Sequence, residues 1–173
     1  MLKLVKPDVK YKSQIEEVIK EVENNSNMDS SGRWYIEINM DKFEEFIKDK
    51  LNQEKGIDLK EGFVSCTTFW VVDEKDKYIG RISLRHKLTE ELLKIGGHIG
   101  YDVRPSERRK GYCSKMLELC LQEAKTMGLK KVLMTCDYDN VGSKKVIEKN
   151  GGKLESQSNY NGKLIRRYWI DLG

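Results

Sequence analysis

The stretch that decides the fold reads IGYDVRPSERRKGYCSKMLELCLQEAKTMG and covers residues 99–128. Its first five residues are a short apolar run, and Pro105 marks the end of that run because a proline restricts the backbone of the residue before it. A charged loop follows, and from Gly111 onward apolar residues recur at the spacing of a helix. The stretch therefore predicts a strand, a basic loop and a helix that ends at Gly128.

The junction between this loop and the helix has the features of an anion-binding site. The first N–H groups of a helix have no partner inside it, and the peptide dipoles favour an anion there by roughly 0.3–1 kcal/mol per interaction. Gly111 lets the backbone approach a phosphate closely or adopt a positive φ. Arg108, Arg109 and Lys110 add three positive charges. We therefore expect residues 108–113 to bind phosphate.

The segment Arg108–Cys113 resembles the R/Q-x-x-G-x-G/A loop of the GCN5-related N-acetyltransferase (GNAT) superfamily. Cys113 departs from this pattern, since Gly or Ala is usual there, but cysteine is small and we expect the loop still to close. The resemblance extends over residues 65–152. It implies that backbone N–H groups of the loop and of the helix start, through Tyr112, Cys113 and Ser114, hold the pyrophosphate of acetyl-CoA.

Two further segments resemble the cofactor site of the same superfamily. The resemblance implies that main-chain groups of Tyr101, Asp102 and Val103 pair with the pantetheine arm of acetyl-CoA, as a neighbouring strand would. The segment Asn140-x-x-Ser143 resembles the Asn-x-x-Ala/Ser helix start of the superfamily. There the Asn side chain contacts the same arm. By residue type alone, Asn140 is equally well explained as a plain helix cap.

The residue that accepts a proton is a separate question. An amine acceptor must lose a proton before its nitrogen attacks, and this calls for a group with a pKa near the working pH. His98, on the expected central strand, titrates in that range, although it can equally be a buried structural histidine. Counting back from Gly111 places the superfamily's usual base at Gly97. A bulge at Gly96-Gly97 is therefore needed to bring His98 to the same face.

The proton donor to the departing thiolate is also open. Many members of the superfamily have a tyrosine for this step at the position of Ile147, so that role cannot be transferred to this sequence. Tyr138 is our candidate, because it lies two residues before Asn140 at the strand end beside the expected thioester. The alternative is a tyrosine packed at a strand end with its hydroxyl group in solvent. Cys113 is not expected to be a nucleophile, since no neighbouring residue in the sequence activates it.

The composition describes a soluble and highly charged protein. Of its 173 residues, 38% are hydrophobic and 35% are charged. The net charge of +4 is too balanced for a typical nucleic-acid-binding protein, and no apolar run approaches the roughly 20 residues of a membrane span. The four cysteines show no metal-ligand spacing. We therefore expect reduced thiols, no metal site, no membrane association and a cytoplasmic protein.

The remaining segments complete an α/β pattern. Helical periodicity occurs over 15–22 and from Phe43 to Leu51, where Asp41 is the expected N-cap. Hairpins are expected over 63–84 and over 153–172, a strand over 131–136 and a helix over 141–150. We predict a single α/β domain over residues 1–173, with a mixed, mostly antiparallel, twisted sheet flanked by helices. This is also the fold that the resemblance to the GNAT superfamily implies.

A polar loop is expected over residues 24–32, followed by Trp34 and Tyr35. These aromatic side chains either pin the loop to the core or line the acceptor pocket, which is the most variable region of the superfamily.

Together these features predict an acetyl-CoA-dependent N-acetyltransferase that acts by direct transfer. The acceptor is a small-molecule or protein amine whose identity the sequence leaves open, and the resemblance allows a homodimer. The alternative is a non-catalytic acyl-CoA-binding or regulatory module. A nucleic-acid-binding protein that uses residues 104–110 fits less well, and a dinucleotide enzyme lacks its G-x-G-x-x-G motif.

Overall fold

The computed structural model describes residues 1–25 and 32–173. Within this part of the chain, the strands form two antiparallel sheets, one in the order β1-β2-β3-β4 and the other in the order β5-β7-β6. The strands are β1 Lys3–Val5, β2 Cys66–Val72, β3 Tyr78–Arg85, β4 Ile99–Val103, β5 Lys131–Asp137, β6 Lys153–Tyr160 and β7 Lys163–Asp171. The α-helices are α1 Lys12–Glu23, α2 Arg33–Ile36, α3 Phe43–Lys55, α4 Glu90–Lys94, α5 Tyr112–Thr126 and α6 Val141–Lys149.

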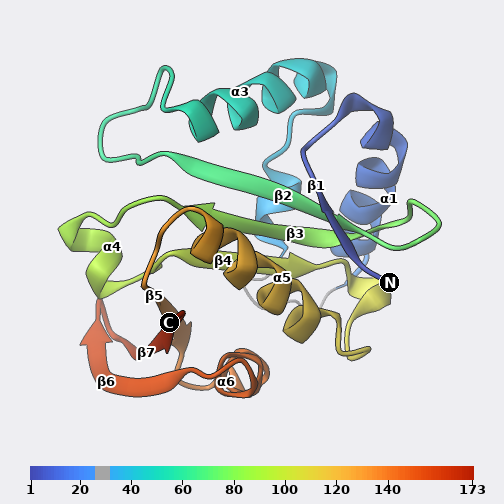
Figure 1. Cartoon of the computed structure of the whole chain (residues 1–173). Helices are drawn as coiled ribbons and strands as arrows, with labels where there is room; N and C mark the ends of the chain where they lie inside the picture. The colour runs from blue at the N-terminus through green and yellow to red at the C-terminus, as the bar shows by residue number, and fades with distance from the viewer. Residues whose placement is uncertain (26–31) are drawn as a thin grey trace.

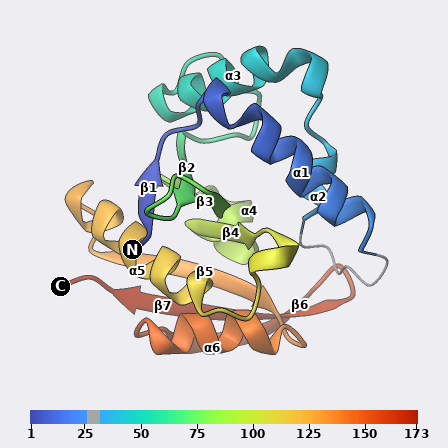
Figure 2. The ribbon, with the colours of Figure 1, turned by 90° about the vertical axis from the view of Figure 1, so that its right-hand side faces the viewer.

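Helices cover both faces of the first sheet. Helix α5 lies across one face, whereas α1 and α3 lie on the other side (Figures 1 and 2). Helix α6 packs below the second sheet, next to β7 and β5 (Figure 2). The predicted α/β fold with antiparallel strands and flanking helices is therefore confirmed.

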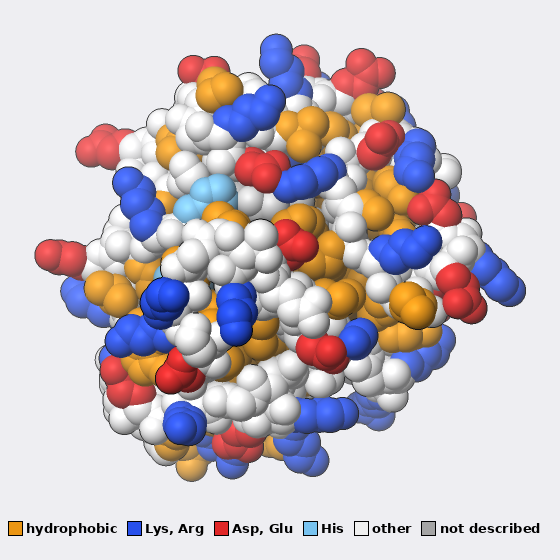
Figure 3. Space-filling view, viewed as in Figure 1, with side chains coloured by type: hydrophobic (Ala, Val, Ile, Leu, Met, Phe, Trp, Pro, Cys, Tyr) orange, Lys and Arg blue, Asp and Glu red, His pale blue; other side chains and the backbone are white. Residues whose placement is uncertain are grey.

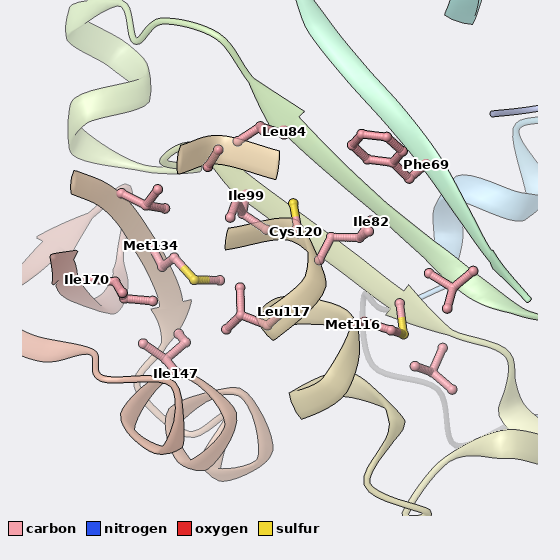
Figure 4. Packing of buried hydrophobic residues seen from close by; sticks show 14 of the residues in the cluster. Phe69, Ile82, Leu84, Ile99, Met116, Leu117, Cys120, Met134, Ile147 and Ile170 are labelled. Atoms are coloured by element: carbon pink, nitrogen blue, oxygen red, sulfur yellow. The ribbon is translucent and has the colours of Figure 1, made fainter. Parts of the chain in front are cut away.

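Two separate hydrophobic cores result from this layering. The larger one lies between α5, α6 and the sheets, where Met116, Leu117 and Cys120 of α5 pack against both sheets and Ile147 (Figure 4). Burying one such side chain stabilises the fold by roughly 1.5–3 kcal/mol. Met127, the last apolar residue before Gly128, is 43% exposed because α5 ends one residue before it.

The second core lies on the opposite face of the first sheet. It is centred on Trp70 of β2, and its rings include Tyr11, Tyr35, Phe43 and Tyr78. Several of these rings meet edge to face, a geometry that the ring quadrupoles favour. Every residue of β2 is buried, because helices cover the strand on one side and α5 covers the sheet on the other.

Of the turn and helix cap predicted from local sequence, the structure confirms the turn and contradicts the cap. The hairpin predicted at Asn161-Gly162 is confirmed, and both residues have the positive φ values (49° and 81°) that the tight turn requires. The cap predicted at Asp41 is wrong. In the structure the side chain of Asn39 accepts a hydrogen bond from the Asp41 N–H group, in a short 3-10 turn that precedes α3.

The two sheets are joined by a hydrogen-bonded contact between His98 and Leu133. The His98 N–H group donates to the Leu133 carbonyl oxygen at 2.8 Å, and the Leu133 N–H group donates to His98 Nδ1 at 2.9 Å. Gly97 packs on the same carbonyl group, where a Cβ atom would clash, and it has φ +59°. Among the described residues, β4 and β5 are edge strands of different sheets and are not paired with each other as a ladder.

A buried arginine links α1 to the loop that follows β4. Arg104 is 4% exposed, and its guanidinium group pairs with Glu21 of α1 and, at 3.4 Å, with Glu17. Glu21 also accepts hydrogen bonds from the N–H and hydroxyl groups of Ser106, at 3.1 and 3.0 Å. Burial alone would raise the pKa of Glu21, but the bonds from Arg104 and Ser106 outweigh it and lower that pKa. The loop is therefore anchored before it reaches the helix.

We predict that Glu21→Gln lowers the free energy of unfolding by about 3 kcal/mol at pH 7, because it leaves a buried arginine short of its main partner. The lowered pKa of Glu21 means that this stabilisation is complete above the ordinary glutamate pKa and is lost as the pH falls through the folded-state value. Urea unfolding at several pH values measures the difference in the free energy of unfolding between the wild type and the variant. The control is Glu17→Gln, whose side chain is 64% exposed and should cost under about 1 kcal/mol. Equal losses in the two variants would contradict the assignment.

Candidate active site

A cleft of about 510 Å³ opens beside the C-terminal end of β4. The end of β4, the loop after it, the first turn of α5 and the start of α6 line it. Of the cofactor-binding residues expected from the sequence, the structure brings all but Lys110 to this cleft. They are Tyr101, Asp102, Val103, Arg108, Arg109, Gly111, Tyr112, Cys113, Ser114, Asn140 and Ser143.

The backbone of the loop is shaped for an anion. Gly111 has φ +79° and Arg109, although not a glycine, has φ +61°. A left-handed non-glycine residue costs on the order of 1–3 kcal/mol, and such residues cluster at ligand sites. No side chain caps the start of α5, so its first N–H groups remain available to a ligand. Successive N–H groups in such a turn form an anion-binding concavity.

The three cations of the loop have different roles. Lys110 Nζ donates to Glu107 at 2.8 Å, and Lys77 Nζ donates to the same carboxylate at 2.5 Å. Glu107 is 5% exposed, and the hydrogen bonds from Lys110 and Lys77 lower its pKa. Arg108 Nε donates to the carbonyl oxygen of Val103 at 3.1 Å. Lys110 therefore stabilises the loop through its bond to Glu107 and does not line the cleft, whereas Arg108 and Arg109 do.

A tyrosine bridges the cleft from β4 to α6. The Tyr101 hydroxyl group donates to Ser143 Oγ at 3.1 Å, and Asn140 Oδ1 accepts from the Ser143 N–H group at 2.9 Å. Asn140 thus caps α6, as its residue type predicted. Burial is the main cause that raises the pKa of Tyr101, so its phenol is neutral at pH 7. Sequence reasoning assigned only main-chain groups of Tyr101 to the site, although the alternation of β4 indicates that its side chain faces α5.

A second pocket of about 260 Å³ lies on the other side of this bridge. It is lined by Arg85, Gly96, Thr135 and Asp137, and it shares Tyr101 and Ser143 with the larger cleft. The hydroxyl pair therefore stands between two openings. A group that enters through the larger cleft can meet a second molecule from the smaller pocket at this point.

The two candidate proton-transfer residues lie outside both openings. His98 is 7% exposed, its Nδ1 accepts from Leu133, and burial lowers its pKa so that the ring is neutral. Gly96 and Gly97 both have positive φ, but they precede β4, which pairs with β3 without a register shift, and His98 is not among the residues that line either pocket. Tyr138 is 44% exposed, and the Arg166 guanidinium group stacks on its ring at 3.9 Å.

Three other side chains singled out in the sequence occupy defined positions. Cys113 is half-buried at the cleft, and burial raises the pKa of its thiol, which agrees with a residue that is not a nucleophile. Trp34 packs on Phe46, and the Arg81 guanidinium group lies 4.1 Å from the Trp34 ring. Tyr35 belongs to the second core, so it pins α2 in place. Residues 26–31 of the expected polar loop lie outside the described residues.

The wider surface agrees with the balanced charge. On the face shown in Figure 3, basic and acidic side chains are interspersed. None of the helices in the described parts of the chain is long and apolar enough to cross a membrane.

Comparison with known proteins places this geometry in a family. The chain is 29% identical over 92 residues to the uncharacterised N-acetyltransferase YjdG of Bacillus subtilis, a match that covers 51% of this chain and spans about half (53%) of that relative.

The solved structures resemble it over nearly the whole chain. One is the microcin C7 self-immunity acetyltransferase MccE in complex with acetyl-CoA and AMP (TM-score 0.70, 18% identity, 98% of this chain and 92% of that one). Another is the spermidine N-acetyltransferase of Vibrio cholerae in complex with CoA and spermine (TM-score 0.68, 19% identity, 99% and 95%). At these identities the likeness shows the fold.

The family itself is shown by the sequence. A family model described as an acetyltransferase (GNAT) domain matches residues 13–153, which include both sides of the cleft. The chain therefore belongs to the GNAT family of acetyltransferases.

Proposed function

We propose that this protein transfers the acetyl group of acetyl-CoA directly to a primary amine. The observation that carries the proposal is the cleft beside the end of β4, which combines the uncapped start of α5 with an edge strand of the first sheet. The first feature suits a pyrophosphate and the second suits the amide-bearing arm that follows it. Acetyl-CoA supplies an activated thioester, and the chain supplies its placement.

The largest contribution that this geometry can make to the rate is to hold the thioester and the amine next to each other. The cleft and the smaller pocket meet at Tyr101 and Ser143, so thioester and amine would be held side by side. Such positioning replaces an encounter of two molecules in solution and can lower the activation free energy of the transfer by up to about 7–11 kcal/mol.

We propose that this site works as one domain over residues 1–173 in the cytoplasm, which the four free thiols support. The acceptor is a small molecule or a protein amine.

We further propose that Tyr101 protonates the departing thiolate. It is the hydroxyl group at the meeting point of the two openings, and its neutral phenol has a proton to give there. Ser143 holds the hydroxyl in place. His98, by contrast, fits a structural role at the contact between the sheets, so we propose that the amine loses its proton to water or to Asp137 in the smaller pocket.

Gly111→Asp should abolish the rise in melting temperature that CoA causes. The substitution places a carboxylate where the pyrophosphate is expected, and ligand binding to the folded state is what raises the melting temperature. The control is Gly128→Asp at the other end of α5. Both glycines have positive φ (79° and 87°) and no atom within 4 Å of an added Cβ, so both variants carry similar strain. An undiminished CoA shift in Gly111→Asp would contradict the phosphate site.

Tyr101→Phe should lower kcat by about 10²- to 10⁴-fold, the usual contribution of general acid catalysis, and leave acetyl-CoA binding intact. Tyr138→Phe is the matched control and should retain the wild-type rate, because Tyr138 lies outside the cleft. Steady-state release of the CoA thiol with a reactive amine measures both variants. If Tyr138→Phe is slower than Tyr101→Phe, Tyr138 rather than Tyr101 is the proton donor. If the protein binds acetyl-CoA but acetylates none of a broad set of amines, the non-catalytic alternative is favoured.

A further inference from the structure

The face of the first sheet that lies opposite α5 carries an unusual set of cations. Arg81 and Arg85 lie on β3 four residues apart, so both project from this face, and Arg85 pairs in register with Cys66 of β2. Lys50 comes from α3, which covers the same strand pair; its Nζ lies 5.4 Å from the Phe46 ring. Phe46 in turn contacts Trp34, the ring on which Arg81 stacks. We call Lys50, Arg81 and Arg85 the cationic face.

The carboxylates near this face do not balance its charge. Asp102 forms an ion pair with Arg81 at 2.5 Å, and both side chains are largely buried. None of the ion pairs among the described residues includes Lys50 or Arg85. Asp49, the acidic neighbour of Lys50 along α3, is exposed. Two half-buried cations are thus left without a carboxylate partner.

Such an arrangement is costly in the absence of an anion. Burying a charge is unfavourable unless a partner compensates it, and like charges nearby add to the cost. Burial and the charge of Arg81 lower the pKa of Lys50, and burial lowers that of Arg85. Among the described residues, Arg85 donates hydrogen bonds through Nη1 alone, to the carbonyl oxygens of Gly97 at 2.9 Å and Gly96 at 3.3 Å.

The position of Arg85 connects this charge to the site. It lines the smaller pocket, on the side of the Tyr101–Ser143 bridge away from the phosphate loop. An acceptor that enters there brings its amine to the bridge and its remaining atoms toward β3. The guanidinium group is a good match for a carboxylate or a phosphate, because its donors form a planar fork.

We propose that Arg85 of the cationic face binds an anionic group of the acceptor in the smaller pocket, so that the acceptor is an amine that also carries a carboxylate or a phosphate. This inference rests on the proposed acetyl transfer and narrows its substrate class. It separates this chain from an enzyme that selects polycationic amines, since the positive charge of Arg85 in the smaller pocket would repel a second ammonium group.

Binding is tested first on protein saturated with CoA, which fills the phosphate loop. Inorganic phosphate and succinate are titrated in separately while the side-chain N–H resonances of Arg85 and Trp34 are followed by NMR. We expect saturable shifts with at least one probe, and a roughly 10- to 100-fold weaker affinity in Arg85→Gln, because hydrogen bonds to charged groups are lost. The control is Lys87→Gln, an exposed cation two residues away, which should bind as the wild type does.

Matched acceptor pairs then test selectivity: lysine against cadaverine, and phosphoethanolamine against ethanolamine. We expect at least one anion-bearing member to exceed its partner about 10-fold or more in kcat/KM. Arg85→Gln should remove that preference through KM of the acceptor, with KM of acetyl-CoA unchanged, and Arg85→Lys should restore part of it.

The outcomes separate the two proposals. Saturation with CoA but no saturable shift at Arg85 or Trp34 would overturn the anionic acceptor and leave acetyl transfer standing, as would a preference for cadaverine and ethanolamine. Failure of CoA to bind would contradict the proposed function itself. If none of the four amines reacts, the NMR titration alone decides the inference.

Discussion

The active site depends on one contact, the pair of hydrogen bonds between His98 and Leu133. It holds the two sheets together at one end and leaves the facing edges of β4 and β5 in different sheets beyond it. Backbone N–H and carbonyl groups on such edges need partners when they are shielded from water. The proposed pantetheine arm, an extended chain with amide groups of its own, would supply such partners in the cleft.

The phosphate end of the cleft owes its shape to buried charges of opposite sign on either side of Pro105. Arg104 fixes the loop to α1 through Glu21, and Glu107 fixes it to Lys110 and to Lys77 of the β2–β3 turn. These pairs hold a loop that includes the left-handed backbone of Arg109. A loop that is rigid before the ligand arrives loses less conformational entropy on binding.

The sequence was sufficient wherever the signal was local. The order of strand, basic loop, glycine and helix predicted both α5 and the cleft beside it, and Asn161-Gly162 predicted the last hairpin. Signals that depend on distant partners could not be read in this way. Lys110 turns to Glu107 rather than to the cleft, and the hydrogen-bond partner of the Tyr101 hydroxyl group is Ser143, 42 residues further along the chain. The positions of His98 and Tyr138 are likewise decided by Leu133 and Arg166, which no spacing rule connects to them.

The separation of the two hydrophobic cores has a consequence for how this protein can change over time. The cofactor cleft rests on the core beneath α5, whereas Trp34 and Phe46 pack against the core around Trp70. Mutations in groups that share no contacts have nearly additive effects on stability. A lineage can therefore remodel the layer of α1, α2 and α3 for a new acceptor at little cost to the cofactor cleft. The exception is the Arg104–Glu21 pair, which ties α1 to the phosphate loop and limits how far that layer can drift.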